Sequence, residues 1–175
     1  MWISKSDFRK KNKLENKFML LGVATSWDEM KGFSDYLKLA NILDSDYKVV
    51  LVGLTKEQIK QLPNNVIGIE RTASIKELAQ IYTAADLFLN LSYCENYPTV
   101  NIEAMACGTP VLTYKTGGSS EIVEEYDGFV VEQGNISAVA ETIQLLMKKG
   151  LKRVLIDKSK FDNAQVTNNY LKLYI

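Results

Sequence analysis

The residues best suited to do chemistry are two glutamates, Glu95 and Glu103, which stand eight positions apart. An apolar run typical of a buried strand precedes Glu95. Pro98 suits the first turn of a helix, where its missing N–H is no loss, and nothing in 99–106 breaks a helix before Gly108 ends it. The sequence therefore predicts a strand, a loop carrying Glu95, and a helix with Glu103 about one and a half turns from its start.

This arrangement places both carboxylates near one end of a parallel sheet, with the N-terminus of the helix between them. The N–H groups at such an end favour an anion. Carboxylates do not attract anions, so here they are better suited to accept hydrogen bonds from hydroxyl groups. A molecule with phosphates and many hydroxyls, a nucleotide sugar, matches both features. The alternative, a solvated loop glutamate beside a glutamate on a helix surface, stays open on spacing alone.

Two further motifs flank the glutamates, namely Tyr-Thr-Ala-Ala-Asp at 82–86 and Thr-Gly-Gly-Ser-Ser-Glu-Ile-Val at 116–123. Together with the loop and helix between them, they resemble the donor half of a retaining glycosyltransferase of family 4, the group 1 transferases with the GT-B fold. Glu95 and Glu103 match the E-x7-E motif of that family. The resemblance runs from about residue 18 to residue 147, with several motifs in the right order.

The resemblance implies roles for both glutamates and for a lysine. It assigns Glu103 to the ribose hydroxyls and Glu95, as the catalytic residue, to the hexose. Lys31, which precedes Gly32 at a helix start, is implied to meet the diphosphate, because a cation and a closely approaching backbone suit phosphate. The alternative for Lys31 is an exposed surface lysine. Thr25 stands where the family usually has a phosphate-binding arginine, six residues before the lysine; this departure bears on the strength of diphosphate binding, and Thr25 could still donate a hydrogen bond there.

The other positions implied to bind the nucleotide sugar lie in three loops. Ala73 corresponds to the turn that lies against the base, whose edge neighbouring backbone groups would read. The amides of Tyr97 and Thr99 are implied to contact the sugar or the β-phosphate. Gly117 and Gly118 would let a substrate approach closely, although a glycine pair is often only a turn. Backbone readout leaves no side-chain signal, so the sequence does not separate uracil from guanine.

Composition and charge fit a cytoplasmic globular domain. Of the 175 residues, 46% are hydrophobic and 24% are charged, as is ordinary for soluble proteins. The formal net charge is zero, so nothing points to nucleic acid. The apolar runs are far shorter than the roughly 18 residues of a membrane helix, and residues 1–5 lack the core of a signal peptide. The basic run at 9–13 predicts a solvated face; its alternative is peripheral contact with the inner face of a membrane.

The sequence contains no arrangement of residues that indicates a metal or a cofactor. It has no histidine, and its two cysteines, Cys94 and Cys107, lack metal-ligand spacing. The residues 44–46 spell the D-x-D of metal-dependent transferases, but they precede a strand, at the wrong end of the sheet, and predict a turn. We therefore expect no metal and no cofactor; a nucleoside diphosphate sugar of the UDP or GDP type would be the substrate.

Predicted strands alternate with predicted helices, which favours an α/β fold with a doubly wound, six-stranded parallel sheet. The strands are predicted at 18–24, 47–52, 66–69, 87–91, from 111, and at 128–131. Residues 1–17 form a partly helical lead-in segment, 18–150 a Rossmann-like nucleotide-sugar-binding domain, and 151–175 a helical C-terminal segment. Because such sheets bind ligands at the carboxyl ends of their strands, the loops at 24–31, 69–74, 92–98 and 114–119 should form the site.

The resemblance implies an enzyme that transfers a hexose from a nucleoside diphosphate sugar to a glycan or lipid-linked acceptor, in surface polysaccharide biosynthesis. Members of the family have two domains that close on one cleft, and 175 residues have room for one. We therefore expect an N-terminal acceptor-binding domain to be missing from this chain, which would be inactive alone. The alternative is a non-catalytic nucleotide- or partner-binding module.

Overall fold

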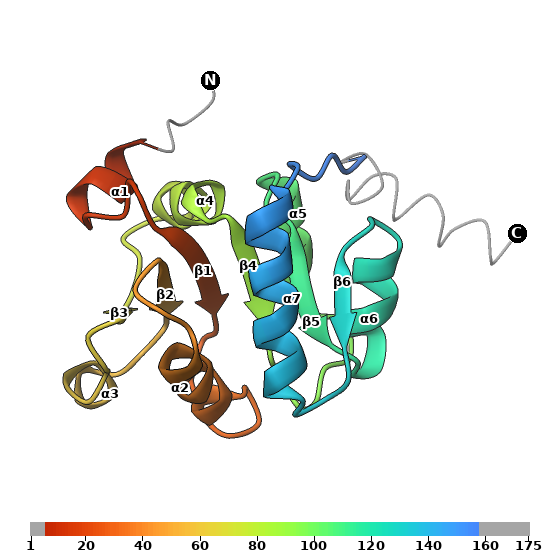
Figure 1. Ribbon diagram of the computed structural model, residues 1–175, viewed down its shortest axis with the longest axis horizontal. Coiled ribbons are helices and arrows are strands. Elements are labelled where there is room, and N and C mark those ends of the chain that lie inside the picture. Colours follow the sequence, from red (N-terminus) through yellow and green to blue (C-terminus); the bar gives the residue numbers. More distant parts are fainter. Residues whose placement is uncertain (1–5, 158–175) are drawn as a thin grey trace, which may run out of the picture.

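A six-stranded parallel sheet lies between two layers of helices in the computed structural model, which describes residues 6–157 (Figure 1). The strands are β1 (Phe18–Val23), β2 (Tyr47–Val52), β3 (Val66–Ile69), β4 (Leu87–Asn90), β5 (Val111–Tyr114) and β6 (Phe129–Val131). The helices are α1 (Ser6–Lys11), α2 (Phe33–Ile42), α3 (Lys56–Lys60), α4 (Ile75–Ala84), α5 (Thr99–Ala106), α6 (Gly117–Glu124) and α7 (Ile136–Lys149). The predicted fold class and all six predicted strands are confirmed.

The strand order, β3-β2-β1-β4-β5-β6, reverses its direction once. The chain winds outward from β1 to β3, returns to the middle of the sheet at β4, and winds outward again to β6. β1 and β4 are therefore neighbours, with Leu20 opposite Leu87 in the register. The connections leave these two strands toward opposite sides, so a crevice opens at their carboxyl ends. Doubly wound sheets bind their ligands at such a point.

Both faces of the sheet are buried, which explains why its strands are almost continuous apolar runs. Along β1, Leu20 packs into one hydrophobic cluster, whereas Met19 and Leu21 pack into the other. Helices α2 and α7 cover the first face, and α1, α4, α5 and α6 cover the second. Because helices occupy both faces, polar groups for a ligand must come from the loops at the strand ends.

Local signals place the helix starts close to their predicted positions. The side chain of Thr55 accepts a hydrogen bond from the N–H of Gln58 (3.2 Å), and the Gln58 side chain accepts one from the N–H of Thr55 (3.0 Å), as predicted for a capping box. Ser74 caps α4 by accepting the N–H of Glu77 at 3.1 Å. Pro98 is the N-cap of α5 rather than its first residue. The two polar caps satisfy N–H groups that have no partner within their helices.

Both ends of the described chain differ from the sequence prediction. Residues 151–157 have no regular secondary structure, so the helix expected for 151–175 is wrong there, and 158–175 lie outside the described residues. The lead-in segment is not separate from the domain either. Its helix α1 packs against α4, and Leu14 is fully buried in the same cluster as Met19. The boundary predicted after residue 17 does not divide two structural units.

Two arginines tie these end segments to the amino edge of the sheet. Arg9, from the run predicted as a solvated face, is only 13% exposed; it donates to the carbonyl of Ala84 at 2.8 Å and pairs with Asp86. Arg153 donates to the carbonyl of Thr83. Both carbonyls belong to the last turn of α4, where cations are favourable. The prediction of a solvated face was therefore wrong for Arg9, because the sequence does not show which side of a short helix is covered.

Candidate functional site

A cleft of about 260 Å³ lies at the carboxyl ends of β1 and β4. The loop after β1 contributes Ala24, Thr25, Trp27 and Lys31 to its lining, and the loop after β4 with the start of α5 contributes Ser92, Glu95, Tyr97, Pro98, Thr99 and Val100. Four of the eight predicted site residues, Lys31, Glu95, Tyr97 and Thr99, thus meet in one cavity. They come from the two sides of the crevice that the strand order creates.

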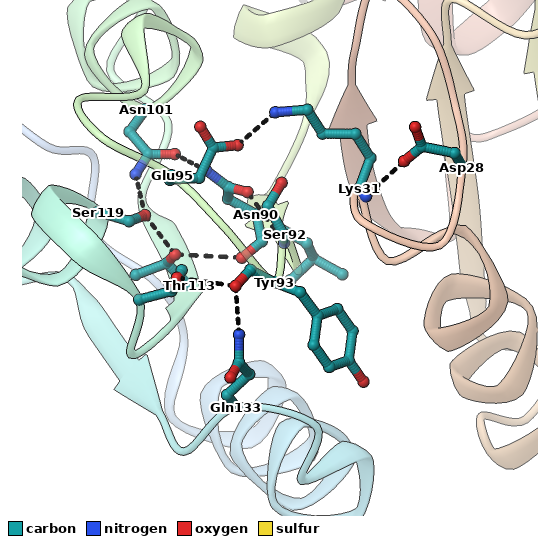
Figure 2. A network of polar contacts seen from close by, with 12 residues as sticks. Asp28, Lys31, Asn90, Ser92, Tyr93, Glu95, Asn101, Thr113, Ser119 and Gln133 are labelled. Atoms are coloured by element: carbon teal, nitrogen blue, oxygen red, sulfur yellow. Dashed lines mark hydrogen bonds and ion pairs between the residues drawn. The ribbon is translucent and has the colours of Figure 1, made fainter.

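An ion pair between Lys31 and Glu95 spans this cleft (Figure 2). Lys31 Nζ lies 2.7 Å from Glu95 Oε1; the lysine side chain is 36% exposed and that of the glutamate 12%. The backbone of Lys31 is held by Asp28, whose Oδ1 accepts the Lys31 N–H at 2.9 Å. The sequence predicted that these two residues share a site, but not that they contact each other.

The loop between β4 and α5, residues 91–98, is called the Glu95 loop below. It is fixed chiefly through Tyr93 (Figure 2). Its N–H donates to the carbonyl of Met30 at 2.8 Å, which joins the loops after β1 and β4. Its carbonyl accepts from Gln133 Nε2 at 2.6 Å and from Thr116 Oγ1 at 3.2 Å. The loop is therefore held from two sides, by the loop after β1 and by the segments after β5 and β6, and these hydrogen bonds also fix the position of Glu95.

The hydroxyl of Tyr93 completes this support by donating to Asp35 Oδ2 at 2.7 Å. The same oxygen accepts from Tyr114 at 2.8 Å, and Lys38 donates to Oδ1 at 2.9 Å. Burial alone raises the pKa of Asp35, but the hydrogen bonds from Lys38, Tyr93 and Tyr114 outweigh it and lower the pKa. The carboxylate is only 2% exposed and stays charged, so it links α2 to β5 and to the Glu95 loop.

A buried chain of polar side chains positions α5 and α6. Asn90 Nδ2 donates to Asn101 Oδ1 at 3.0 Å, Asn101 Nδ2 donates to Ser119 Oγ at 2.9 Å, and Ser119 Oγ lies 2.6 Å from Thr113 Oγ1. The four residues belong to β4, α5, α6 and β5. Because every bond is buried, a shift of either helix would leave polar groups unpaired at a cost of about 1–3 kcal/mol each. In the sequence, this series of hydrogen-bonded side chains is indicated by polar residues at positions that are otherwise apolar.

The glycine pair lies against the protein's own backbone. A Cβ on Gly117, whose φ is +43°, would stand 1.7 Å from the carbonyl oxygen of Glu95, and one on Gly118 would stand 2.2 Å from that of Asn96. The N–H of Gly118 donates to the Asn96 carbonyl at 3.0 Å. These glycines permit the close approach of the Glu95 loop, and neither lines the cleft. Their predicted contact with a substrate stays a prediction.

Glu103 and Ala73 also lie outside the lining of the cleft. Glu103 is exposed on α5 and accepts a hydrogen bond from the hydroxyl of Tyr82 at 3.0 Å. Burial and then the Glu103 carboxylate raise the pKa of Tyr82, so this hydroxyl stays a donor. Ala73 is exposed just before α4, and its N–H donates to Glu77 Oε2 at 2.6 Å. The contacts with a ligand that were predicted for both residues stay predictions.

Trp27, Asn90 and Ser92 are among the lining residues that the sequence reasoning did not single out. Trp27 is buried and donates from its ring nitrogen to the carbonyl of Val52 at 2.9 Å, which anchors the loop after β1. Asn90 Oδ1 accepts the N–H of Ser92 at 3.2 Å and so shapes the start of the Glu95 loop. An asparagine that ends a buried apolar strand is the signal that would have indicated it.

Neither a metal site nor a membrane span is found in residues 6–157. No group of three or more histidine, cysteine, aspartate or glutamate side chains there is arranged to hold a metal ion. Asp44 accepts the N–H of Asp46 at 2.9 Å in a turn before β2, as predicted for the D-x-D sequence. Within the same range, no helix combines the length and the apolar character needed to cross a membrane.

A doubly wound parallel sheet with polar loops gathered at its switch point defines a Rossmann-like ligand-binding domain. The model of the family "Glycosyl transferases group 1" matches residues 4–161. The chain therefore belongs to the group 1 glycosyltransferases.

Relatives support this assignment over most of the chain. N-acetyl-alpha-D-glucosaminyl L-malate synthase of Bacillus anthracis is 30% identical over 146 residues, which is 76% of this chain and 38% of that protein. N,N'-diacetylbacillosaminyl-diphospho-undecaprenol alpha-1,3-N-acetylgalactosaminyltransferase of Campylobacter jejuni is 25% identical over 178 residues, 95% of this chain and 47% of that protein. The chain thus spans less than half the length of these relatives.

Solved structures agree with the fold. Anabaena HepE in complex with UDP-glucose matches with a TM-score of 0.73 and 26% identity, over 83% of this chain and 43% of that chain. The C-terminal domain of the group 1 glycosyl transferase LpcC from Francisella tularensis shares the fold at 23% identity, with a TM-score of 0.64 over 79% of this chain and 80% of that one. The fold is that of the C-terminal domain of a GT-B glycosyltransferase.

Proposed function

We propose that this chain binds a nucleoside diphosphate sugar in the cleft between β1 and β4, as the donor domain of a retaining glycosyltransferase. The enzyme would transfer a hexose to a glycan or lipid-linked acceptor, in surface polysaccharide biosynthesis. The observation that carries the proposal is that Lys31 and Glu95 face each other across the switch point of the sheet. A phosphate and a sugar bound side by side need such a cation and such an acceptor of hydroxyl hydrogen bonds.

The site's chemistry fits departure of a diphosphate. Such a reaction depends on stabilising the negative charge of the leaving group more than on a protein base. Lys31 supplies a positive charge at the cleft, and the first turn of α5 supplies N–H groups that have no partner within the helix. Glu95 would accept hydroxyls of the hexose, close to where positive charge develops in the transition state. Glu103 would accept the ribose hydroxyls outside the cleft.

A second domain would complete the enzyme. The chain matches less than half of the length of its relatives, and a GT-B cleft is formed by two domains. We therefore expect the acceptor site to lie in an N-terminal domain beyond this chain and the chain to transfer no sugar alone. Thr25, which lines the cleft where the family's arginine is expected, favours a second candidate, a non-catalytic nucleotide-binding module.

Calorimetric titration of this chain with UDP, GDP, ADP and their sugars tests the binding function. At least one nucleoside diphosphate sugar should bind, and binding of none would overturn the proposal. The same chain incubated with donors and candidate acceptors should give no product. In a full-length protein that contains the second domain, turnover separates the enzyme from the non-catalytic module.

Lys31→Ala identifies the phosphate contact within this binding. Loss of a charge-assisted hydrogen bond should weaken nucleoside diphosphate binding by about 1.5–3 kcal/mol and leave the nucleoside unaffected. Lys115→Ala is the matched control, because Lys115 also lies at the carboxyl edge but is 62% exposed, pairs with Glu132 and does not line the cleft. Equal effects of the two substitutions would show that only the general positive potential matters.

A further inference from the structure

The ion pair in the cleft joins the two groups to which the proposed function gives separate ligand contacts. Lys31 Nζ and Glu95 Oε1 are 2.7 Å apart, so each group already has the other as its charged partner (Figure 2). The contact is not one between loose surface chains. Asp28 fixes the backbone of Lys31, and the Glu95 loop is held by Tyr93 and packed against Gly117.

We propose that Glu95 stands in for a diphosphate at Lys31, and that this pair makes the site select a sugar-bearing nucleotide over the bare nucleoside diphosphate. The inference rests on the proposed function. A bare diphosphate that takes Lys31 leaves Glu95 without its cation, 12% exposed and close to the new negative charge. Both desolvation and like-charge repulsion oppose that state.

A sugar-bearing nucleotide avoids this penalty. Its diphosphate takes Lys31 in the same way, but its hexose brings hydroxyl donors to the carboxylate that the lysine has left. Glu95 Oε2 makes no hydrogen bond within the described part of the chain, so both carboxylate oxygens are then available to hydroxyls. The exchange of one charged partner for several hydroxyl donors keeps Glu95 satisfied. After transfer the hexose is gone, and the returning ion pair helps to expel the nucleotide.

The ion pair therefore predicts that one substitution in the site strengthens nucleotide binding instead of weakening it. Glu95→Gln removes the charge that competes for Lys31 and retains the size of the side chain, so the bare nucleotide should bind about tenfold more tightly. The sugar-bearing nucleotide should not gain, because it loses a charged acceptor for its hydroxyls. The ratio of the two affinities should therefore fall. A glutamate that contacts only the hexose predicts instead no change for the bare nucleotide.

Calorimetric titration with UDP, GDP and their glucose and mannose conjugates measures these affinities. Glu29→Gln is the control for loss of one negative charge, because Glu29 is exposed, accepts from Ser34 and lies close to Lys31 in sequence without pairing with it. Its effect should be about twofold or less. Glu95→Ala should reproduce the gain in affinity for the bare nucleotide that is expected of Glu95→Gln. Adding Lys31→Met to either variant should abolish this gain.

The possible outcomes separate this inference from the function on which it rests. Failure of the unmodified chain to bind any of these nucleotides rejects the proposed function. Binding by the unmodified chain, with no tighter binding of bare UDP or GDP in Glu95→Gln or Glu95→Ala, rejects the role of the ion pair alone. An equal gain in Glu29→Gln also rejects it, because the effect would then come from net charge.

Discussion

The cation near the amino ends of the strands, Arg9, and the cation near their carboxyl ends, Lys31, are bound in different ways; these two ends are called the amino edge and the carboxyl edge of the sheet. At the amino edge, Arg9 donates to the carbonyl of Ala84 at 2.8 Å and to that of Lys17 at 3.0 Å, and it also pairs with Asp86. At the carboxyl edge, the side chain of Lys31 contacts a single carboxylate among residues 6–157, that of Glu95. The arginine is 13% exposed and the lysine 36%. Arg9 therefore makes several fixed bonds, whereas Lys31 makes one exchangeable bond.

This difference separates a structural cation from one suited to a ligand. A guanidinium has five donors in a fixed plane, and at Arg9 several of them meet backbone carbonyls that cannot move away. A ligand would have to replace all of these bonds at once. An ammonium that makes one contact to a side chain in an open cleft can change partners at small cost. The comparison predicts that substitution of Arg9 changes stability, and that substitution of Lys31 changes affinity.

Arg9→Ala should produce the largest effect on stability. It leaves Asp86 and the carbonyls of Ala84 and Lys17 without the cation, so the free energy of unfolding should fall by about 2–4 kcal/mol. Urea denaturation measures this loss. Nucleotide affinity of the folded fraction should stay unchanged, and Lys10→Ala, from the same basic run, should have little effect. A loss of affinity in Arg9→Ala would break the distinction between the two edges.

The sequence predicted the carboxyl edge better than the amino edge, for a physical reason. Alternating apolar runs and caps such as Thr55 and Ser74 are local signals, and they predicted the strands, their parallel arrangement in a doubly wound sheet and most helix starts. The position of the site follows from that arrangement, because doubly wound sheets bind ligands at the carboxyl ends of their strands. The individual roles implied for Glu95 and Glu103 came from the family motif rather than from these local signals.

Contacts between distant segments could not be predicted in this way. The bond from Arg9 to Ala84 joins residues 75 positions apart, and nothing local distinguishes Arg9 from the lysines beside it. The pairing of Lys31 with Glu95 likewise depends on how two loops are held by Tyr93 and Gly117. The sequence identifies residues that suit a ligand, whereas only the structure shows that two of them, Lys31 and Glu95, pair with each other.

Gly117→Ala tests whether the backbone contact at the carboxyl edge positions Glu95. The added Cβ would stand 1.7 Å from the Glu95 carbonyl oxygen at a φ of +43°, so the loop must move. Stability should fall by about 1–3 kcal/mol, and binding of a sugar nucleotide should weaken as well. Gly150→Ala is the matched control. Its φ is +74° but no atom of residues 6–157 lies within 4 Å of the added Cβ, so it should cost about 1 kcal/mol and leave binding intact.

Asp35→Asn sharpens the comparison, because a buried charge here supports the carboxyl edge itself. The change weakens hydrogen bonds from Tyr93 and Tyr114 and should lower stability by about 1–2 kcal/mol at neutral pH. The folded state lowers the pKa of Asp35, so its contribution is present above the unfolded pKa of about 4 and is lost as the pH falls through the folded value.

Urea denaturation at a series of pH values measures this dependence. The difference between the unmodified chain and Asp35→Asn should be constant above about pH 4 and should shrink below it. Asp44→Asn, at an exposed turn, should show little difference at any pH. A difference for Asp35→Asn that does not change with pH would mean that the amide disturbs packing rather than removing a charge.

Glu103→Gln should have the smallest effect on stability and a clear effect on affinity. Glu103 is exposed, and the hydrogen bond from Tyr82 uses its Oε2 at 3.0 Å. If the carboxylate accepts the ribose hydroxyls, its neutral replacement should weaken UDP or GDP and their sugars alike, by about 1–2 kcal/mol. Tyr82→Phe is the control, since it removes the hydroxyl next to Glu103 without removing the acceptor. Titration of Glu103→Gln and of Glu95→Gln, each with a nucleotide and with its sugar, gives the four affinities that decide. Equal weakening in Glu103→Gln, beside unequal changes in Glu95→Gln, would place the ribose and the hexose at different glutamates; no weakening in Glu103→Gln would leave it a surface residue of α5.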